Sequence, residues 1–128
     1  MKIVKTVILV FAAITVMACN NDDDNTPQNQ APVVEDKTIS VSENLTSDLL
    51  TTIAATDVEG DTLIYSIVSQ SPSDSVLINE LTGEVFVNNA SVFDYDVNQV
   101  ITVVISVSDG ENVSTSTLII NITEYIAG

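Results

Sequence analysis

The stretch Ile101-Thr102-Val103-Val104-Ile105-Ser106-Val107 decides the fold class of this chain of 128 residues. Every second side chain from Ile101 to Val107 is aliphatic, which is typical of a β-strand that buries one face and exposes the other. Shorter runs of the same kind occur at residues 39–41, 53–55, 63–67, 76–78, 85–87 and 118–122. Turn-forming residues separate these runs, and we find no convincing helix. The pattern predicts an all-β fold, a single seven-stranded Greek-key β-sandwich over residues 31–126.

The first 18 residues have the layout of a secretory signal peptide. Lys2 and Lys5 supply a short positive region, and the run from Val7 to Met17 is almost wholly apolar. This run is far shorter than the roughly 20 residues that a membrane-spanning helix needs. We therefore expect the chain to be exported, and we leave residues 1–18 out of the folded domain.

Cys19 follows directly on this segment. The stretch Val16-Met17-Ala18-Cys19 resembles the lipobox of bacterial lipoproteins. The resemblance implies cleavage before Cys19 and a diacylglycerol on its thiol, which would anchor the chain in a membrane. An ordinary signal peptide with a leftover thiol is the alternative. We favour the lipid, because a lone cysteine in an exported protein has no internal disulfide partner.

Residues 19–30 form a polar, acidic tether between the lipid site and the sandwich. Asp22, Asp23 and Asp24 resemble the surface-export signal of lipoproteins in Bacteroidetes-type bacteria, whereas a plain polar linker is the alternative. We expect the protein in the cell envelope, anchored in the outer membrane, with display at the cell surface if the acidic run acts as an export signal.

The charge of the chain limits its partners. Beyond residue 18 there are 18 acidic residues and only one basic residue, Lys37, which gives a net charge of about −17. Such a surface repels nucleic acid and anionic lipid head groups, and it attracts cations. The chain contains no histidine, and its one cysteine is assigned to the lipid. We therefore do not expect an enzyme.

Seven short stretches, taken in order, resemble those of the cadherin repeat. They are Ala31-Pro32-Val33-Val34, Ser42-Glu43-Asn44, Ala55-Thr56-Asp57-Val58-Glu59-Gly60-Asp61, Ile64-Tyr65-Ser66-Ile67, Ile78-Asn79 through Thr82-Gly83-Glu84-Val85, Phe93-Asp94-Tyr95-Asp96 and Val107-Ser108-Asp109-Gly110. The resemblance implies a cadherin-like, immunoglobulin-like sandwich, Ca²⁺ as cofactor and a role in cell adhesion. One departure is that the family's terminal Asp-x-Asn-Asp linker is missing, with only Glu124 and Tyr125 near its place.

The carboxylates fall into two groups if consecutive strands alternate in direction. An N-terminal pole gathers Asp57, Glu59, Asp61, Asp109 and Glu111, and a C-terminal pole gathers Glu43, Asp94, Asp96 and Glu124. Carboxylates crowded together repel one another unless a cation lies between them, and Ca²⁺ prefers six to eight such oxygens. The alternative is that these residues only cap turns, as aspartate commonly does.

We favour a metal site at the N-terminal pole, made by Asp57, Glu59, Asp61 and Asp109, with Asn29 and Asp22 to Asp24 offering further oxygens. Glu43, Asp94 and Asp96 form the weaker candidate, because in cadherins a following repeat completes that site.

Two functions remain open on the sequence. The first is a calcium-binding adhesion or protein-interaction module, lipid-anchored at the cell surface, with a protein partner or self-association. The second is an accessory surface lipoprotein that binds polysaccharide through a sandwich face. Sugar-binding faces usually stack aromatic rings on the glycan, and the mature chain has only five aromatic residues. This favours the first function.

Overall fold

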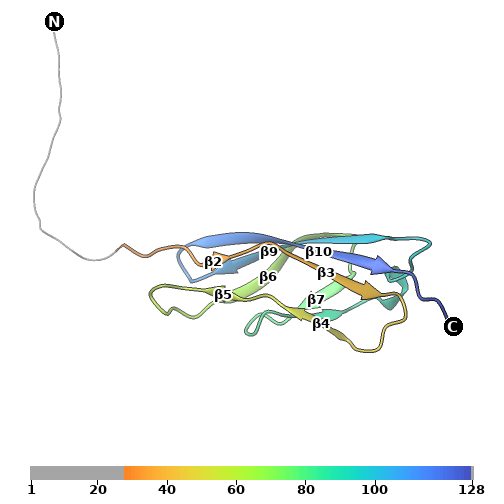
Figure 1. Ribbon diagram of the computed structural model, residues 1–128. Helices are drawn as coiled ribbons and strands as arrows, with labels where there is room; N and C mark the ends of the chain where they lie inside the picture. Colours follow the sequence, from red (N-terminus) through yellow and green to blue (C-terminus); the bar gives the residue numbers. More distant parts are fainter. Residues whose placement is uncertain (1–27, 128) are drawn as a thin grey trace, which may run out of the picture.

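The computed structural model describes residues 28–127, which form a two-layered β-sandwich with the two ends of this segment at opposite poles (Figure 1). The predicted signal peptide, Cys19 and the acidic run Asp22 to Asp24 lie outside the described residues. Within that part of the chain, no helix is long and apolar enough to cross a membrane.

The first layer is a four-stranded sheet in the order β3-β10-β9-β6. It consists of β3 (Lys37–Ser42), β10 (Val113–Thr123), β9 (Val100–Ser108) and β6 (Ile64–Ser71). β10 pairs with β9 antiparallel and with β3 parallel, and β6 pairs with the other side of β9 antiparallel.

The second layer is a three-stranded sheet in the order β4-β8-β7, together with a separate two-stranded ladder. The sheet consists of β4 (Leu49–Thr52), β8 (Glu84–Val87) and β7 (Val76–Ile78), and the ladder pairs β2 (Val33–Val34) with β5 (Ala55–Thr56). One turn of 3₁₀ helix, Ala90–Val92, precedes β9.

Seven strand positions account for these nine segments, because the first strand is divided into β2 and β3 and the second into β4 and β5. The all-β sandwich predicted from the sequence is confirmed.

The core follows from the alternation that decided the fold class. In β9 the side chains of Ile101, Val103, Ile105 and Val107 are buried, while the residues between them are half-buried on the outer face. β10 supplies Leu118, Ile120 and Ile122 to the same core. Its register sets Leu118 opposite Val103 and Ile120 opposite Ile101, so two rows of aliphatic side chains pack side by side.

The second strand differs from the continuous run expected over residues 53–55. Ile53 lies between β4 and β5, with its side chain buried and its N–H donated to the carbonyl of Gly83 at 2.8 Å. Gly83 has a φ of +77°, and a Cβ there would lie 2.5 Å from the Ile53 oxygen. Glycine is therefore required at this close approach. The strand changes partner at Ile53, since β4 pairs with β8 and β5 pairs with β2.

The division of the first strand is fixed by β10. The carbonyl of Glu35, between β2 and β3, accepts a hydrogen bond from Ser116 Oγ at 2.8 Å. The carboxylate of Asp36 accepts one from the backbone N–H of Thr117, also at 2.8 Å. These bonds hold the chain where it passes from the second layer to the first.

We predict that Ile105→Ala lowers the free energy of unfolding by about 2–5 kcal/mol, because it leaves a cavity in a fully buried part of the core. Thr115→Ala, on the exposed face of β10, should change it by less than about 1 kcal/mol. Urea denaturation followed by far-ultraviolet circular dichroism measures both. Equal losses for the two variants would contradict this assignment of the buried and exposed faces.

Candidate functional site

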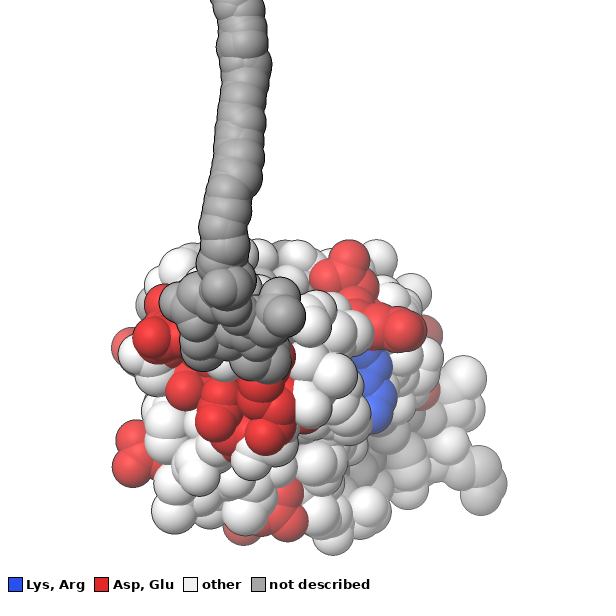
Figure 2. Space-filling model, turned by 90° about the vertical axis from the view of Figure 1, so that its left-hand side faces the viewer, with Lys and Arg blue, Asp and Glu red and all other residues white. Residues whose placement is uncertain are grey.

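Three segments far apart in the sequence meet at the N-terminal pole. They are Asn29–Gln30 before β2, the β5–β6 loop beginning at Asp57, and the β9–β10 loop beginning at Asp109. Figure 2 looks onto this end of the molecule and shows carboxylates gathered on it. The β5–β6 and β9–β10 loops therefore lie at the same pole, as the alternating strand directions inferred from the sequence predicted.

Asp57 organises the β5–β6 loop. Its Oδ1 atom accepts hydrogen bonds from the backbone N–H groups of Glu59 at 2.9 Å and Asp61 at 3.1 Å. The loop curls around this oxygen, so the side chains of Glu59 and Asp61 return towards that of Asp57. One carboxylate oxygen from each of the three residues lies within 4.8 Å of the others. Such a group of hard oxygen ligands suits a divalent cation.

The second oxygen of Asp57 distinguishes this loop from an ordinary capped turn. Asp57 Oδ2 is buried, and no described residue forms a hydrogen bond to it. A buried polar atom without a partner is destabilising by about 1–3 kcal/mol, and by more when it is charged. Most buried polar groups in folded proteins are satisfied, so this oxygen is the atom of the loop that is open to a ligand.

Asp109 occupies the adjacent loop in a similar way. Its Oδ1 atom accepts from the backbone N–H groups of Asn112 at 2.7 Å and Glu111 at 2.8 Å. These two N–H groups hold the pKa of Asp109 below its ordinary value, with a smaller contribution in the same direction from the Asn29 amide. The neighbouring side chain of Asp57 contributes least to this lowering of the pKa of Asp109. The two loops thus present neighbouring carboxylates.

The segment that leads into the domain is bonded to both loops. Asn29 Nδ2 donates to Asp109 Oδ2 at 2.9 Å, and the N–H of Gln30 donates to Glu59 Oε1 at 3.2 Å. Asn112 Nδ2 donates to the carbonyl of Asn29 at 3.2 Å. The sequence pointed to Asn29 but not to Gln30 or Asn112. For Asn112 the available signal was its position, three residues after an aspartate in a turn.

The predicted N-terminal ligands are therefore only partly gathered. Asp57, Glu59 and Asp61 form the compact group, and Asp109 adjoins it through Asp57. Glu111 is exposed, and it contributes its backbone N–H rather than its carboxylate to the Asp109 loop.

At the C-terminal pole, Glu43 is held by the backbone. Glu43 Oε2 accepts from the N–H of Tyr95 and Oε1 accepts from the N–H of Tyr125, each at 2.8 Å. These bonds, that of Tyr125 first, lower the pKa of Glu43. We call this arrangement the Glu43 clamp, because it joins the ends of β3 and β10 to the turn before β9.

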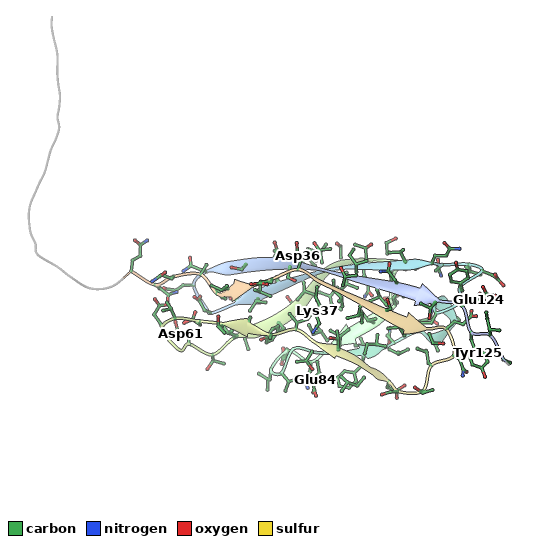
Figure 3. All side chains as sticks on the ribbon, in the orientation of Figure 1. Asp36, Lys37, Asp61, Glu84, Glu124 and Tyr125 are labelled. Atoms are coloured by element: carbon green, nitrogen blue, oxygen red, sulfur yellow. The ribbon has the colours of Figure 1, made fainter. Side chains whose placement is uncertain are left out.

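The other acids at this pole do not join Glu43 in a three-carboxylate group within the described residues. Asp94 Oδ1 accepts from the N–H of Asp96 at 3.0 Å, as in a capped turn. Glu124 is exposed and lies beside Tyr125, at the opposite end of the sandwich from Asp61 (Figure 3).

The sequence matches the Bacterial Ig domain family over residues 29–123. The chain belongs to this family. A search of curated protein sequences found no significant relative.

Among solved structures, the domain is similar to cadherin repeats. Human protocadherin-24 EC1-2 has a TM-score of 0.65 at 24% identity, covering 75% of this chain and 44% of that chain. Mouse cadherin-23 EC22-24 has a TM-score of 0.66 at 18% identity, covering 75% and 33%. Drosophila N-cadherin EC1-4 has a TM-score of 0.63 at 17% identity, covering 74% and 25%.

The chain thus spans less than half the length of each of these cadherin chains. At this level of identity the similarity shows the fold, and the expected cadherin-like sandwich is confirmed. The sequence family to which the chain belongs is that of the bacterial immunoglobulin-like domains.

The Glu43 clamp predicts a specific dependence of stability on pH. A carboxylate whose pKa is lower in the folded than in the unfolded state stabilises the fold above its unfolded pKa. That contribution is lost as the pH falls below about 4.5 towards the folded pKa of Glu43. Glu43→Gln should lower the melting temperature at pH 7, because an amide has one acceptor oxygen for two N–H donors. It should also reduce the loss of stability between pH 5 and pH 3.

Melting curves of the wild type and Glu43→Gln across this pH range test the clamp. Asp109 also has a lowered pKa, so the variant should keep part of the acid dependence. Glu124→Gln is the matched control, since Glu124 is exposed at the same pole. A Glu43→Gln protein with wild-type melting temperatures at both pH values would refute the clamp.

Proposed function

We propose that this chain is a lipid-anchored module for adhesion or protein interaction, and that its N-terminal pole binds Ca²⁺. The observation that carries the calcium proposal is the buried, unpartnered Oδ2 of Asp57 within a group of three carboxylates. A cation at this place satisfies the orphan oxygen and offsets the repulsion among the acids.

The surroundings of the pole support the binding of a cation from solution, because no basic side chain of the described residues lies among these carboxylates. Lys37 is the only basic side chain in the part of the chain that the structure describes. Its Nζ donates to the carbonyl of Thr52 at 3.1 Å, and Figure 2 shows it apart from the gathered carboxylates. No basic side chain therefore offsets the repulsion between the carboxylates of Asp57 and Asp109, whereas a metal ion would.

Ca²⁺ fits this group better than Mg²⁺. Carboxylate and amide oxygens suit the shell of six to eight ligands around Ca²⁺, whereas Mg²⁺ demands a tighter octahedral shell and keeps its waters. Asp57, Glu59, Asp61 and Asp109 would hold the ion. The ion would supply charge neutralisation and would stiffen the junction of the two loops with Asn29, since all three segments are already bonded together.

The adhesion role is supported by the fold and by the family. The domain has the fold of cadherin repeats and belongs to the bacterial immunoglobulin-like domains. The structures similar to it include extracellular domains of protocadherins. The Cys19 lipid would place the domain at the cell envelope, with residues 20–30 as a spacer of at most about 40 Å.

The calcium site predicts a specific effect on thermal stability. For modules outside the cell we expect a dissociation constant of about 10⁻⁴ to 10⁻³ M. Ca²⁺ at about 100 times that value would add roughly 2.7 kcal/mol to the free energy of unfolding. The melting temperature should rise with millimolar CaCl₂ and return on chelation. Asp57→Asn or Asp109→Asn should remove most of the rise.

Two controls separate metal binding from charge screening. MgCl₂ at the same ionic strength should raise the melting temperature much less than CaCl₂. Asp74→Asn removes an acidic side chain outside both poles, and it should leave the calcium response intact. Equal shifts with CaCl₂, MgCl₂ and matched NaCl would show screening alone, and the calcium proposal would fail.

Anchoring is tested separately. Cys19→Ser should leave the precursor unprocessed or release the protein from the membrane fraction, because no thiol is left to carry the lipid. Metabolic labelling with a radioactive fatty acid should mark the wild type and not the variant. Absence of label from the wild-type protein would overturn the lipid anchor.

A further inference from the structure

An apolar row crosses the outer face of the second layer. The register places Phe86 of β8 opposite Leu49 of β4 on one side and opposite Leu77 of β7 on the other. Neighbouring strands lie about 4.8 Å apart, so the three side chains form a continuous row about 10 Å long. Their chain neighbours Leu50, Val85 and Val76 point inward to the core, which sets the row on the outside.

This row is exposed in the described structure. Leu49 retains 43% and Leu77 53% of its surface, and Phe86 is half-buried. The outer face of the first layer is mixed, because hydroxyl side chains such as Thr115 and Thr117 alternate there with aliphatic ones such as Val100 and Val113. On that face Ser66 and Ser106 bond each other at 2.8 Å. Each outward aliphatic residue of β9 and β10 thus stands opposite a polar residue of the neighbouring strand. The second layer instead sets three apolar side chains next to one another, which is the surface expected of an interaction site.

The row continues around the edge of the sandwich. Val68, 60% exposed in an irregular part of β6, and Leu77 line the same open groove of about 580 Å³. The groove is bounded by two cross-layer bonds. The N–H of Tyr65 donates to the carbonyl of Glu80 at 2.9 Å, and the side chain of Gln70 bonds both backbone groups of Val76. Between these bonds, a partner side chain can enter beside Val68 and Leu77.

Acids surround the apolar row. Asp48 precedes Leu49, and Asp74 and Glu80 line the groove beside Leu77. Glu84 stands two residues before Phe86 and therefore on the same face of β8. Figure 3 shows it on the outward side of this sheet. Lys37, the only basic side chain of the described residues, lies at the edge of this sheet, where its Nζ donates to the carbonyl of Thr52 in β4. The four acids outnumber it.

We propose that this face binds a partner protein whose surface has an apolar centre rimmed by Lys and Arg, an inference that rests on the proposed role in protein interaction. Charge complementarity selects this occupant, because like charges set against each other at an interface disfavour association by several kcal/mol. A second copy would bring four more acids to the same interface. It is therefore the occupant that the charges disfavour.

The test uses two synthetic β-hairpin peptides as probes. Both carry the same Val, Leu and Trp residues on one face, with Lys at every rim position in one peptide and Glu in the other. Titration into the ¹⁵N-labelled domain at 50 mM NaCl should shift the amides of Leu49, Leu77, Phe86 and Val68 with the Lys peptide. We expect the Glu peptide to bind at least tenfold more weakly. Binding of the Lys peptide should weaken when the NaCl concentration is raised from 50 to 300 mM, because salt screens the attraction between opposite charges.

Matched variants locate the interface. Leu77→Ser should weaken binding of the Lys peptide at least fivefold, and its side chain is exposed enough that melting should change little. Glu84→Gln should weaken binding and reduce its salt dependence. Thr115→Ser, on the outer face of the first layer, should have no effect. Asp57→Asn should also leave peptide binding unchanged, so a failed calcium site and a failed docking face give different results.

Three results would overturn the proposal. One is no saturable binding of the Lys peptide, and another is equal binding of the Lys and Glu peptides. The third is a concentration-dependent dimer in sedimentation that Leu77→Ser abolishes, because a second copy would then occupy the face.

Discussion

The antiparallel pairing of β9 with β10 is the constraint on which the rest of the structure depends. Its register runs from Val113 opposite Ser108 to Asn121 opposite Val100, and it aligns the aliphatic rows that fill the core. The outer sides of this pair bind β3 and β6, which completes the first layer. The turn that joins the two strands carries Asp109 to the N-terminal pole. The end of β10 carries Tyr125 to the opposite pole, where Glu43 accepts its N–H.

The acidic residues perform two different tasks at the two poles, and the number of free oxygens distinguishes them. Glu43 uses both carboxylate oxygens to accept backbone N–H groups, so its charge is satisfied within the chain. Asp57 uses Oδ1 for the backbone of its own loop and leaves Oδ2 buried without a partner in the described structure. Both residues lie in motifs that resemble calcium-binding motifs. Only Asp57 leaves an oxygen for which the described chain provides no donor.

The sequence predicted those features that depend on local pattern. Period-two alternation located β9 and β10, and the direction of successive strands placed Asp57 and Asp109 at one end. The sequence pattern did not predict the features that depend on contacts between segments far apart in the chain. The change of partner at Ile53 depends on Gly83, 30 residues away, and the Glu43 clamp depends on donors 52 and 82 residues away. The row through Phe86 was missed because a single aromatic residue between two valines is typical of any strand.

The positions of the proposed sites have a consequence for how they would act together. Asn29 and Gln30 are bonded to the same loops that carry Asp57 and Asp109, so an ion there would stabilise the attachment of the tether to the sandwich. The apolar row lies on the side of the sandwich, in the sheet β4-β8-β7, and contributes no ligand to the pole. An ion would then set how firmly this face is oriented relative to the tether without entering the interface itself. Cation binding and partner binding would use separate side chains, and the ion would affect the orientation of the docking face and not its affinity.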